Sequence, residues 1–250
     1  MDVIVPNWPG MPPNVGALST TRRGGISTAP WDDGTGGGGL NLGAHVGDRI
    51  DHVLHNRALL RSMLPSEPAW LSQIHGTHVV DAAGVDLAPE ADASIAVKRG
   101  AVCAILTADC LPVLLCDTKG IVVGAAHAGW RGLAHGILEQ TVAAMRQAGA
   151  ESISAWLGPA IGPERFEVGA EVRDTFLGHD RAACVAFRPV AGLPDKYLAD
   201  IYALARARLA AVGVRQCFGG EFCTVSDPAS FYSYRRDRIT GRMASLIWLK

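Results

Sequence analysis

Residues 107–132 read TADCLPVLLCDTKGIVVGAAHAGWRG, and this stretch decides the fold. It contains two apolar runs, 111–116 and 121–126, separated by Asp117-Thr118-Lys119-Gly120. A type I turn favours Asp at its first position and Gly at its last, so the pattern predicts a β-hairpin. If the turn closes with Asp117 opposite Gly120, then Cys110 lies directly opposite His127 at the open end of the hairpin.

This juxtaposition indicates a reactive or metal-binding site. Directly opposed residues have Cβ atoms about 4.5–5.5 Å apart, which suits two ligands of one metal ion or a Cys–His catalytic pair. The third ligand must come from elsewhere, and His75 and His78 in QIHGTHVV are the candidates. Two histidines and one thiolate leave a coordination position open, as in catalytic zinc sites. After His127, glycines and Arg131 at a strand-to-helix junction are suited to holding an anion.

Outward from this stretch, the chain alternates strands and helices without a repeat or linker, so a single domain over 1–250 is expected. Apolar periodicity predicts helices over 48–63, 133–147, 169–177 and 197–212. Short apolar runs predict strands at 101–106, 152–157 and 244–249, and a strand-loop-strand element at 70–82. The segment 31–43 contains a literal G-x-G-x-x-G at Gly34, Gly36 and Gly39, but no strand precedes it, so we interpret it as a loop.

Composition excludes several functional classes. The net charge is −1 with 19% charged residues, and no basic stripe of the kind that binds nucleic acid is present. The N-terminus lacks the features of a signal peptide, and no run approaches the roughly 20 apolar residues of a membrane span. Six cysteines without a C-x-x-C pair do not form a disulfide framework in a chain of this length. A cytoplasmic protein that binds neither nucleic acid nor membranes is expected.

Five motifs together resemble successive signatures of the YfiH family, in the family order and over almost the whole chain. They are QIHG (73–76), TADC (107–110), HAGWRG (127–132), GPAIG (158–162) and FYSYRRD (231–237). The segments 20–43 and Asn56-Arg57 also fit. The resemblance implies an α/β (α+β) fold with mixed β-sheets packed face to face and flanked by helices. It also implies a zinc ion, with copper as an alternative, bound by His75, Cys110 and His127.

Family members are assigned phosphorolysis of adenosine, inosine, guanosine and S-methyl-5′-thioadenosine, together with deamination of adenosine. The expected partners are therefore a purine nucleoside and phosphate, for a monomer or homodimer. On this basis we expect catalytic roles for Asp109, Cys110 and Arg131. For substrate binding we expect phosphate contacts from Arg22, Arg131, Arg235 or Arg236, and nucleoside contacts from Gln73 and Asn41. Trp130, Phe231 and Tyr232 can stack on a base, but such aromatic residues more often belong to the core, and we favour the core for Trp130.

Two features depart from the family pattern, and three other functions remain open. The glycine run 34–39 expands a loop, and Tyr234 stands where the family often has His. One alternative is a cysteine hydrolase with Cys110 as nucleophile and His127 as base. Another is a copper polyphenol oxidase, although the chain lacks the His-x-His pairs of multicopper clusters. A third is a nucleotide-binding module without catalysis.

Overall fold

The predicted hairpin is present in the computed structural model, which describes residues 1–250, but its register differs from the expectation. Strands β8 (Leu111–Asp117) and β9 (Val123–Ala128) pair with Pro112, not Cys110, opposite His127. The Gly120 amide donates to the Asp117 carbonyl at 2.9 Å, as a type I turn requires, but Ile121 stays in the loop and Asp117 bonds Val122. The slip is two residues, and side chains alternate with a period of two. Cys110 therefore keeps its expected face and becomes a diagonal neighbour of His127.

This hairpin forms the middle of a mixed six-stranded sheet with the order β14-β10-β8-β9-β6-β5. Its other strands are β5 (Val79–Asp81), β6 (Ala93–Ala96), β10 (Ile153–Leu157) and β14 (Cys217–Gly219). A mixed five-stranded sheet has the order β1-β2-β15-β7-β4. It contains β1 (Val3–Ile4), β2 (Val15–Thr20), β4 (Pro68–Ala69), β7 (Val102–Thr107) and β15 (Met243–Leu249), with β3 (Arg23–Ser27) following β2.

The two sheets pack face to face, which explains why β8 is apolar at almost every position. Its side chains alternate between two cores. Leu114 and Cys116 lie between the sheets with Ile105 of β7 and Ile247 of β15. Leu111, Val113 and Leu115 lie on the opposite face, among the helices. A strand buried on both faces reads as a continuous apolar run.

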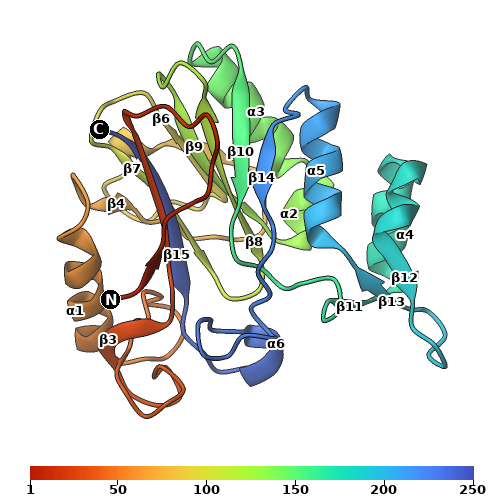
Figure 1. Cartoon of the computed structure of the whole chain (residues 1–250), viewed down its shortest axis with the longest axis horizontal. Coiled ribbons are helices and arrows are strands. Elements are labelled where there is room, and N and C mark those ends of the chain that lie inside the picture. Colours follow the sequence, from red (N-terminus) through yellow and green to blue (C-terminus); the bar gives the residue numbers. More distant parts are fainter.

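Helices cover both outer faces (Figure 1), so the predicted arrangement of face-to-face sheets flanked by helices is confirmed. Helix α1 (Ile50–Arg61) covers the five-stranded sheet, but it buries only Val53, Asn56 and Leu60, while the apolar Leu54, Leu59 and Met63 are exposed. The single helix predicted over 133–147 is two helices, α2 (Trp130–His135) and α3 (Ile137–Gln147). Gly136 separates them with a φ of 99°, which glycine adopts without steric cost.

A small three-stranded unit projects from the side of the six-stranded sheet (Figure 1). It consists of β11 (Glu167–Gly169), β12 (Phe187–Pro189), β13 (Lys196–Ala199), helix α4 (Ala170–His179) and a 3-10 helix (Arg181–Ala186). Helix α5 (Ile201–Ala211) begins later than predicted because residues 196–199 pair in β13. Asp200 caps it by accepting the Ala203 amide at 2.9 Å. Helix α6 (Tyr234–Asp237) and a 3-10 helix (Ala82–Gly84) complete the elements.

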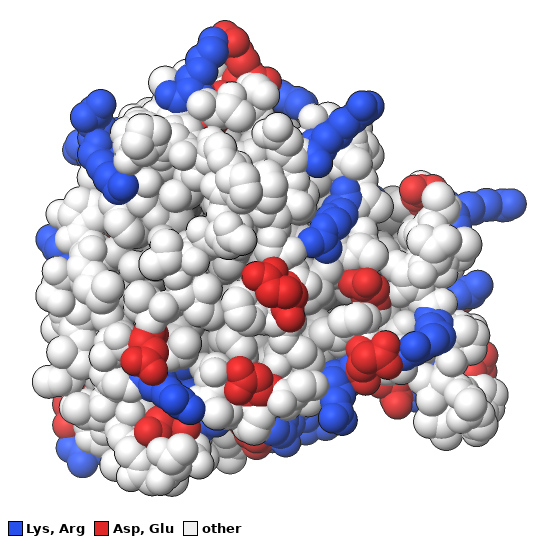
Figure 2. Space-filling view, in the orientation of Figure 1, with Lys and Arg blue, Asp and Glu red and all other residues white.

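The visible surface carries no block of one charge (Figure 2). Blue and red side chains are interspersed over this face, and much of it is uncharged. The helices are all too short or too polar to cross a bilayer.

Candidate active site

Three side chains converge where the chain passes from one sheet to the other. Residues 107–111 connect β7 to β8 and carry Cys110, while His127 lies near the end of β9 and His75 lies in the loop after Gln73. The Cys110 Sγ and His75 Nε2 atoms are 3.8 Å apart, and the ligand atoms of all three residues lie within 4.8 Å of one another. The other candidate, His78, is exposed, and its Nδ1 is 3.1 Å from the Glu90 carbonyl oxygen. The structure thus brings together the three residues expected as ligands.

Asp92, immediately before β6, holds both histidines in position, and it was not predicted from the sequence. Its carboxylate is fully buried and lies 2.8 Å from Nδ1 of His127. It also accepts the backbone amides of Ile74, His75 and Gly76 at 3.2, 2.9 and 2.6 Å. These bonds orient the His127 ring, leave its Nε2 for a ligand, and fix the loop that carries His75.

Backbone constraints explain the glycines of HAGWRG. His75 has a φ of 62°, a left-handed conformation that is uncommon for a side chain with a Cβ, and the Asp92 carboxylate sustains it. A Cβ on Gly129 would lie 2.7 Å from Cδ2 of His75 and 3.1 Å from Sγ of Cys110. A Cβ on Gly132 would lie 3.0 Å from the Gly76 carbonyl oxygen. Only glycine at these positions lets β9 and α2 approach the His75 loop.

Cys110, His127 and Asp92 also shift one another's pKa values. Burial raises the pKa of the Cys110 thiol, but the neighbouring His127 and His75 rings outweigh burial and lower it to about 6. Burial lowers the pKa of His127, but Cys110 and Asp92 outweigh it and raise the value to about 9. The Asp92 carboxyl has a lowered pKa because bonds from His127 and the loop amides outweigh its burial. At neutral pH the metal-free site therefore holds a thiolate, an imidazolium and a carboxylate.

The donor set fits a zinc ion. Two ligands of a tetrahedral zinc, with Zn–S near 2.3 Å and Zn–N near 2.0 Å, lie about 3.5 Å apart, close to the observed 3.8 Å between Cys110 and His75. One thiolate and two imidazoles are ligands that zinc prefers, and a tetrahedral ion would have a fourth position for water or substrate. The ligand atoms lie within 4.8 Å of one another, so side-chain rotation would close the set around an ion.

Two cavities open on this cluster and share His75, Ala108, Cys110 and Tyr234 as a common wall. We call the first the basic cavity; it has a volume of about 270 Å³ and is further lined by His45, Gln73, Leu106, Thr107, His127 and Arg242. We call the second the apolar cavity; it has a volume of about 240 Å³ and is further lined by Asp109, Trp130, Arg131, Ile161, Phe166, Ile201 and Arg235.

Besides the three expected ligands, four residues expected in catalysis or substrate binding line one of these cavities. Arg131 and Arg235 belong to the apolar cavity, and the Arg131 guanidinium lies 4.4 Å from the Trp130 ring. Gln73 lines the basic cavity, but its amide bonds both backbone groups of Leu106 at 2.8 Å. Asp109 borders the apolar cavity, while its carboxylate bonds other parts of the chain.

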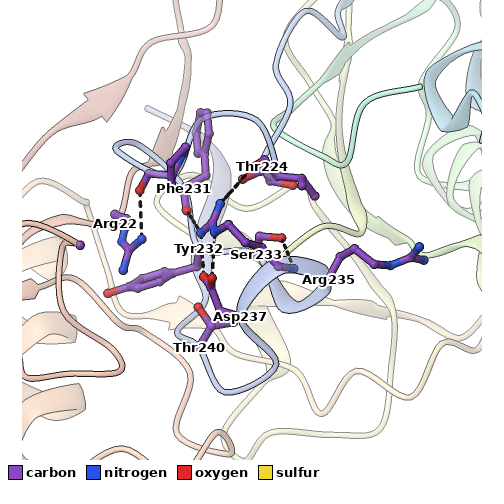
Figure 3. A network of polar contacts seen from close by, with 12 residues as sticks. Arg22, Thr224, Phe231, Tyr232, Ser233, Arg235, Asp237 and Thr240 are labelled. Atoms are coloured by element: carbon purple, nitrogen blue, oxygen red, sulfur yellow. Dashed lines mark hydrogen bonds and ion pairs between the residues drawn. The ribbon is translucent and has the colours of Figure 1, made fainter. Parts of the chain in front are cut away.

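The Asp109 carboxylate accepts the hydroxyls of Thr224 and Ser233 at 2.6 and 3.1 Å and the Arg235 amide at 2.6 Å. Several of these residues are drawn in Figure 3, around the loop that carries α6. These bonds hold Asp109 at a φ of 92° and tie the Cys110 corner to α6. Asp92, and not Asp109, is the carboxylate in contact with a histidine of the cluster.

Arg22, Arg236 and Asn41 line neither cavity, and their expected contacts with substrate stay predictions. Arg22 is buried, lies 4.8 Å from the Tyr232 ring centroid, and donates to the carbonyls of Asp32 and Pro228. Arg236 donates to the carbonyls of Thr224, Val225 and Phe231. The Asn41 side chain accepts the Arg242 amide at 2.9 Å. Arg22 and Arg236 satisfy backbone carbonyls, and Asn41 accepts a backbone amide, so all three residues hold backbone segments together.

Among the aromatic residues, Phe231 and Tyr232 are buried in the core, whereas Trp130 borders the apolar cavity. His45 and Arg242 were not identified from the sequence, and they lie far from the cluster along the chain. Asn56 is buried and bonds Ser27, Gly39 and Asn41, which explains why Asn stands within a helix there.

Comparison with known proteins gives consistent matches over nearly the full length. Residues 16–250 match the family model described as multi-copper polyphenol oxidoreductase laccase. The chain is 54% identical over 250 residues to purine nucleoside phosphorylase YfiH of Escherichia coli strain K12, covering 99% of this chain and 98% of that protein. It is 52% identical over 247 residues to purine nucleoside phosphorylase PA4543 of Pseudomonas aeruginosa, with coverages of 99% and 98%.

Solved structures also match over nearly the full length of the chain. The crystal structure of Neisseria meningitidis protein NMB0706, of family DUF152, superposes with a TM-score of 0.92 and 46% identity, covering 100% of both chains. The Bacillus licheniformis hypothetical protein YfiH superposes with a TM-score of 0.86 and 30% identity, covering 94% of this chain and 93% of that chain.

Proposed function

We propose that this protein, which belongs to the YfiH family, is a zinc-dependent purine nucleoside phosphorylase. The family model that it matches is described as multi-copper polyphenol oxidoreductase laccase. The proposed substrates are adenosine, inosine, guanosine and S-methyl-5′-thioadenosine, with adenosine deamination as a second activity. The observation that carries the proposal is the His75–Cys110–His127 cluster at the junction of a basic and an apolar cavity. A nucleoside and an anion both need places beside the reacting bond, and the two cavities supply them.

His75, Cys110 and His127 would hold the zinc ion, with Asp92 fixing the tautomer of His127. When bound, zinc acts as a Lewis acid that polarises an oxygen or lowers the pKa of a water. The same open position would serve both phosphorolysis and the attack of water on C6 of adenosine during deamination.

The apolar cavity supports the assignment of a purine base to its interior. Ile161, Phe166 and Ile201 give it apolar walls, and Trp130 adds an aromatic surface. Flat heteroaromatic rings bind in such cavities by excluding water and stacking, while a few polar groups set their orientation. Arg131 and Arg235 are the two arginines of this cavity, and their charge would stabilise the electron pair that the base takes from the C1′–N9 bond.

One observation favours a second candidate, a cysteine hydrolase. In the metal-free site, the Cys110 thiol has a pKa of about 6 and sits beside a His127 whose pKa is about 9. That is the charge state of an activated cysteine nucleophile. The copper oxidase alternative has the His2Cys donor set in its favour, but the structure contains a single cluster of this kind.

A metal-exchange experiment separates these candidates. The purified protein is stripped with a chelator, reloaded with zinc or copper, and assayed with the four nucleosides plus phosphate. The proposal expects zinc to restore activity, and bound zinc to protect Cys110 from iodoacetamide. Activity in the stripped protein that iodoacetamide abolishes would favour the hydrolase, and phenol oxidation by the copper form alone would favour the oxidase.

The cellular setting follows from the same proposal. All six cysteines are free thiols in the structure, which is typical of a reducing compartment. We therefore propose a cytoplasmic enzyme whose partners are a nucleoside and phosphate. Whether it is a monomer or a homodimer stays a prediction for measurement in solution.

A further inference from the structure

The basic cavity is lined by an arginine side chain that has no ion-pair partner. Arg242 lines it, and only its Nη1 is bonded within the protein, to the carbonyls of Thr240 and Gly241 at 3.1 and 2.9 Å. Arg57 lies outside the cavity lining, donates to the Leu42 carbonyl, stacks 4.2 Å from the Trp70 ring, and is near enough to Glu67 for that carboxylate to oppose the lowering of its pKa by burial. Neither arginine belongs to any ion pair of the structure.

The positive charge near the basic cavity also affects His45. Its pKa is lowered, first by burial and then by the charges of Arg242 and Arg57. Burial also lowers the pKa of Arg242 itself. The negative charges of Cys110 and Asp109 offset this effect of burial only in part. A cavity wall of partly desolvated cations without an ion-pair partner is stabilised by an anion and gains little from a neutral ligand.

We propose that the basic cavity is the subsite for inorganic phosphate, held by the free edge of Arg242 with His45 and Thr107 adding neutral hydrogen bonds. This inference rests on the proposed phosphorylase function and deepens it. The planar guanidinium presents parallel N–H groups that match two phosphate oxygens. Asn41 supports the subsite indirectly, because its side chain accepts the Arg242 amide at 2.9 Å and fixes the strand start.

The other arginines near the site are less suited to this task. Arg22 and Arg236 are occupied by carbonyls. Arg235 lines the apolar cavity and donates to the Glu167 carbonyl at 2.8 Å, and Arg131 lies over Trp130. Phosphate and base are thus assigned to opposite sides of the wall that contains Cys110 and Tyr234.

That division places the ribose at the junction, with its two reacting bonds on opposite sides. A phosphate oxygen forms a bond to C1′ while the C1′–N9 bond breaks and its electron pair goes to the base. The proton of hydrogen phosphate passes to the base, so the products are free purine and ribose 1-phosphate. Attack from the side opposite the base inverts C1′, so a β-nucleoside gives α-ribose 1-phosphate.

The test compares Arg242→Gln, Arg242→Lys and His45→Gln with wild type, using Arg146→Gln as the matched control. Arg146 also donates to a single stretch of backbone, the Val212 carbonyl, but lines neither cavity. The zinc-loaded proteins are assayed for the KM of phosphate and of adenosine separately. We expect Arg242→Gln to raise the phosphate KM about tenfold or more, since hydrogen bonds between charged groups are the strong ones, and to leave the adenosine KM within about twofold.

Binding of inorganic phosphate alone, by equilibrium dialysis, tests the subsite independently of turnover. If wild type makes no product, the phosphorylase proposal fails, whereas phosphate binding that is lost in Arg242→Gln and retained in Arg242→Lys still supports the subsite. Equal phosphate binding in wild type and Arg242→Gln overturns the subsite, as does a loss that occurs in Arg235→Gln instead. Adenosine 5′-monophosphate displacing phosphate from the same subsite at much lower concentration would overturn the assignment to free phosphate.

Discussion

Replacing Asp92 by Asn keeps the size and shape of the side chain and changes only its hydrogen-bonding capacity. Each carboxylate oxygen of Asp92 has two partners. Oδ1 bonds the His75 amide and His127 Nδ1, and Oδ2 bonds the amides of Ile74 and Gly76. An amide has one oxygen and one NH2 group. If the NH2 group faces the Ile74 and Gly76 amides, two of the four bonds are lost; if it faces the His75 amide and His127, the His75 bond is lost and His127 must change tautomer to keep its own.

The magnitude follows from this count. Hydrogen bonds to a charged group contribute about 1.5–3 kcal/mol each, so losing one or two costs about 1.5–6 kcal/mol at this fully buried position. For a chain of this size, 1 kcal/mol corresponds to about 2–4 °C in Tm, so Asp92→Asn should lower Tm by roughly 3 °C or more. Zinc affinity should fall about 10–100-fold, because the carboxylate no longer orients both histidines.

The assay combines thermal unfolding of the metal-free protein with zinc competition against a chelating dye. Asp81→Asn is the matched control, because Asp81 is exposed and accepts only the Ala83 amide. We expect the control to keep wild-type zinc affinity and nearly all of its Tm. An Asp92→Asn protein with unchanged Tm and zinc affinity within about threefold of wild type would refute the role given to Asp92.

Two further predictions concern the cluster itself. Gly129→Ala places a Cβ 2.7 Å from Cδ2 of His75 and 3.1 Å from Sγ of Cys110, so we expect zinc affinity to fall at least about tenfold, as dye competition would show, and wild-type affinity would contradict the close approach. Zinc binding at pH 7.5 should release about one proton, because the pKa of Cys110 is about 6 and that of His127 is about 9, so the thiol is already ionised and the imidazolium must deprotonate. Calorimetry in two buffers of different ionisation enthalpy counts this proton, and a count of zero would exclude the thiolate–imidazolium pair.

Local patterns predict the sheet core well because burial on both faces makes β8 apolar throughout. The turn at Asp117–Gly120 is also correct, yet the pairing slips by two residues because Ile121 remains in the loop. Periodicity does not reveal such a slip, since a shift of two preserves every face. The break at Gly136 was not predicted, because a glycine inside a helical pattern can either be tolerated or end the helix.

The sequence identified some residues of the candidate site and not others. His75, Cys110 and His127 are identifiable because their residue types are rare and chemically distinctive. Asp92, His45 and Arg242 are missed because their role depends on partners distant in sequence, and no spacing encodes it. Arg22 and Arg236 look like phosphate ligands in a sequence, but the structure shows that buried carbonyls occupy their donors.

We propose that the zinc-loaded protein transfers a nucleoside's ribose to phosphate at the His75–Cys110–His127 site. The most direct measurement is the release of adenine from adenosine with and without inorganic phosphate, for wild type and Cys110→Ala. The account predicts adenine and ribose 1-phosphate in equal amounts from wild type, only when phosphate is present, and neither from Cys110→Ala. Adenine release that is independent of phosphate, no release from zinc-loaded wild type, or undiminished release from Cys110→Ala would contradict it.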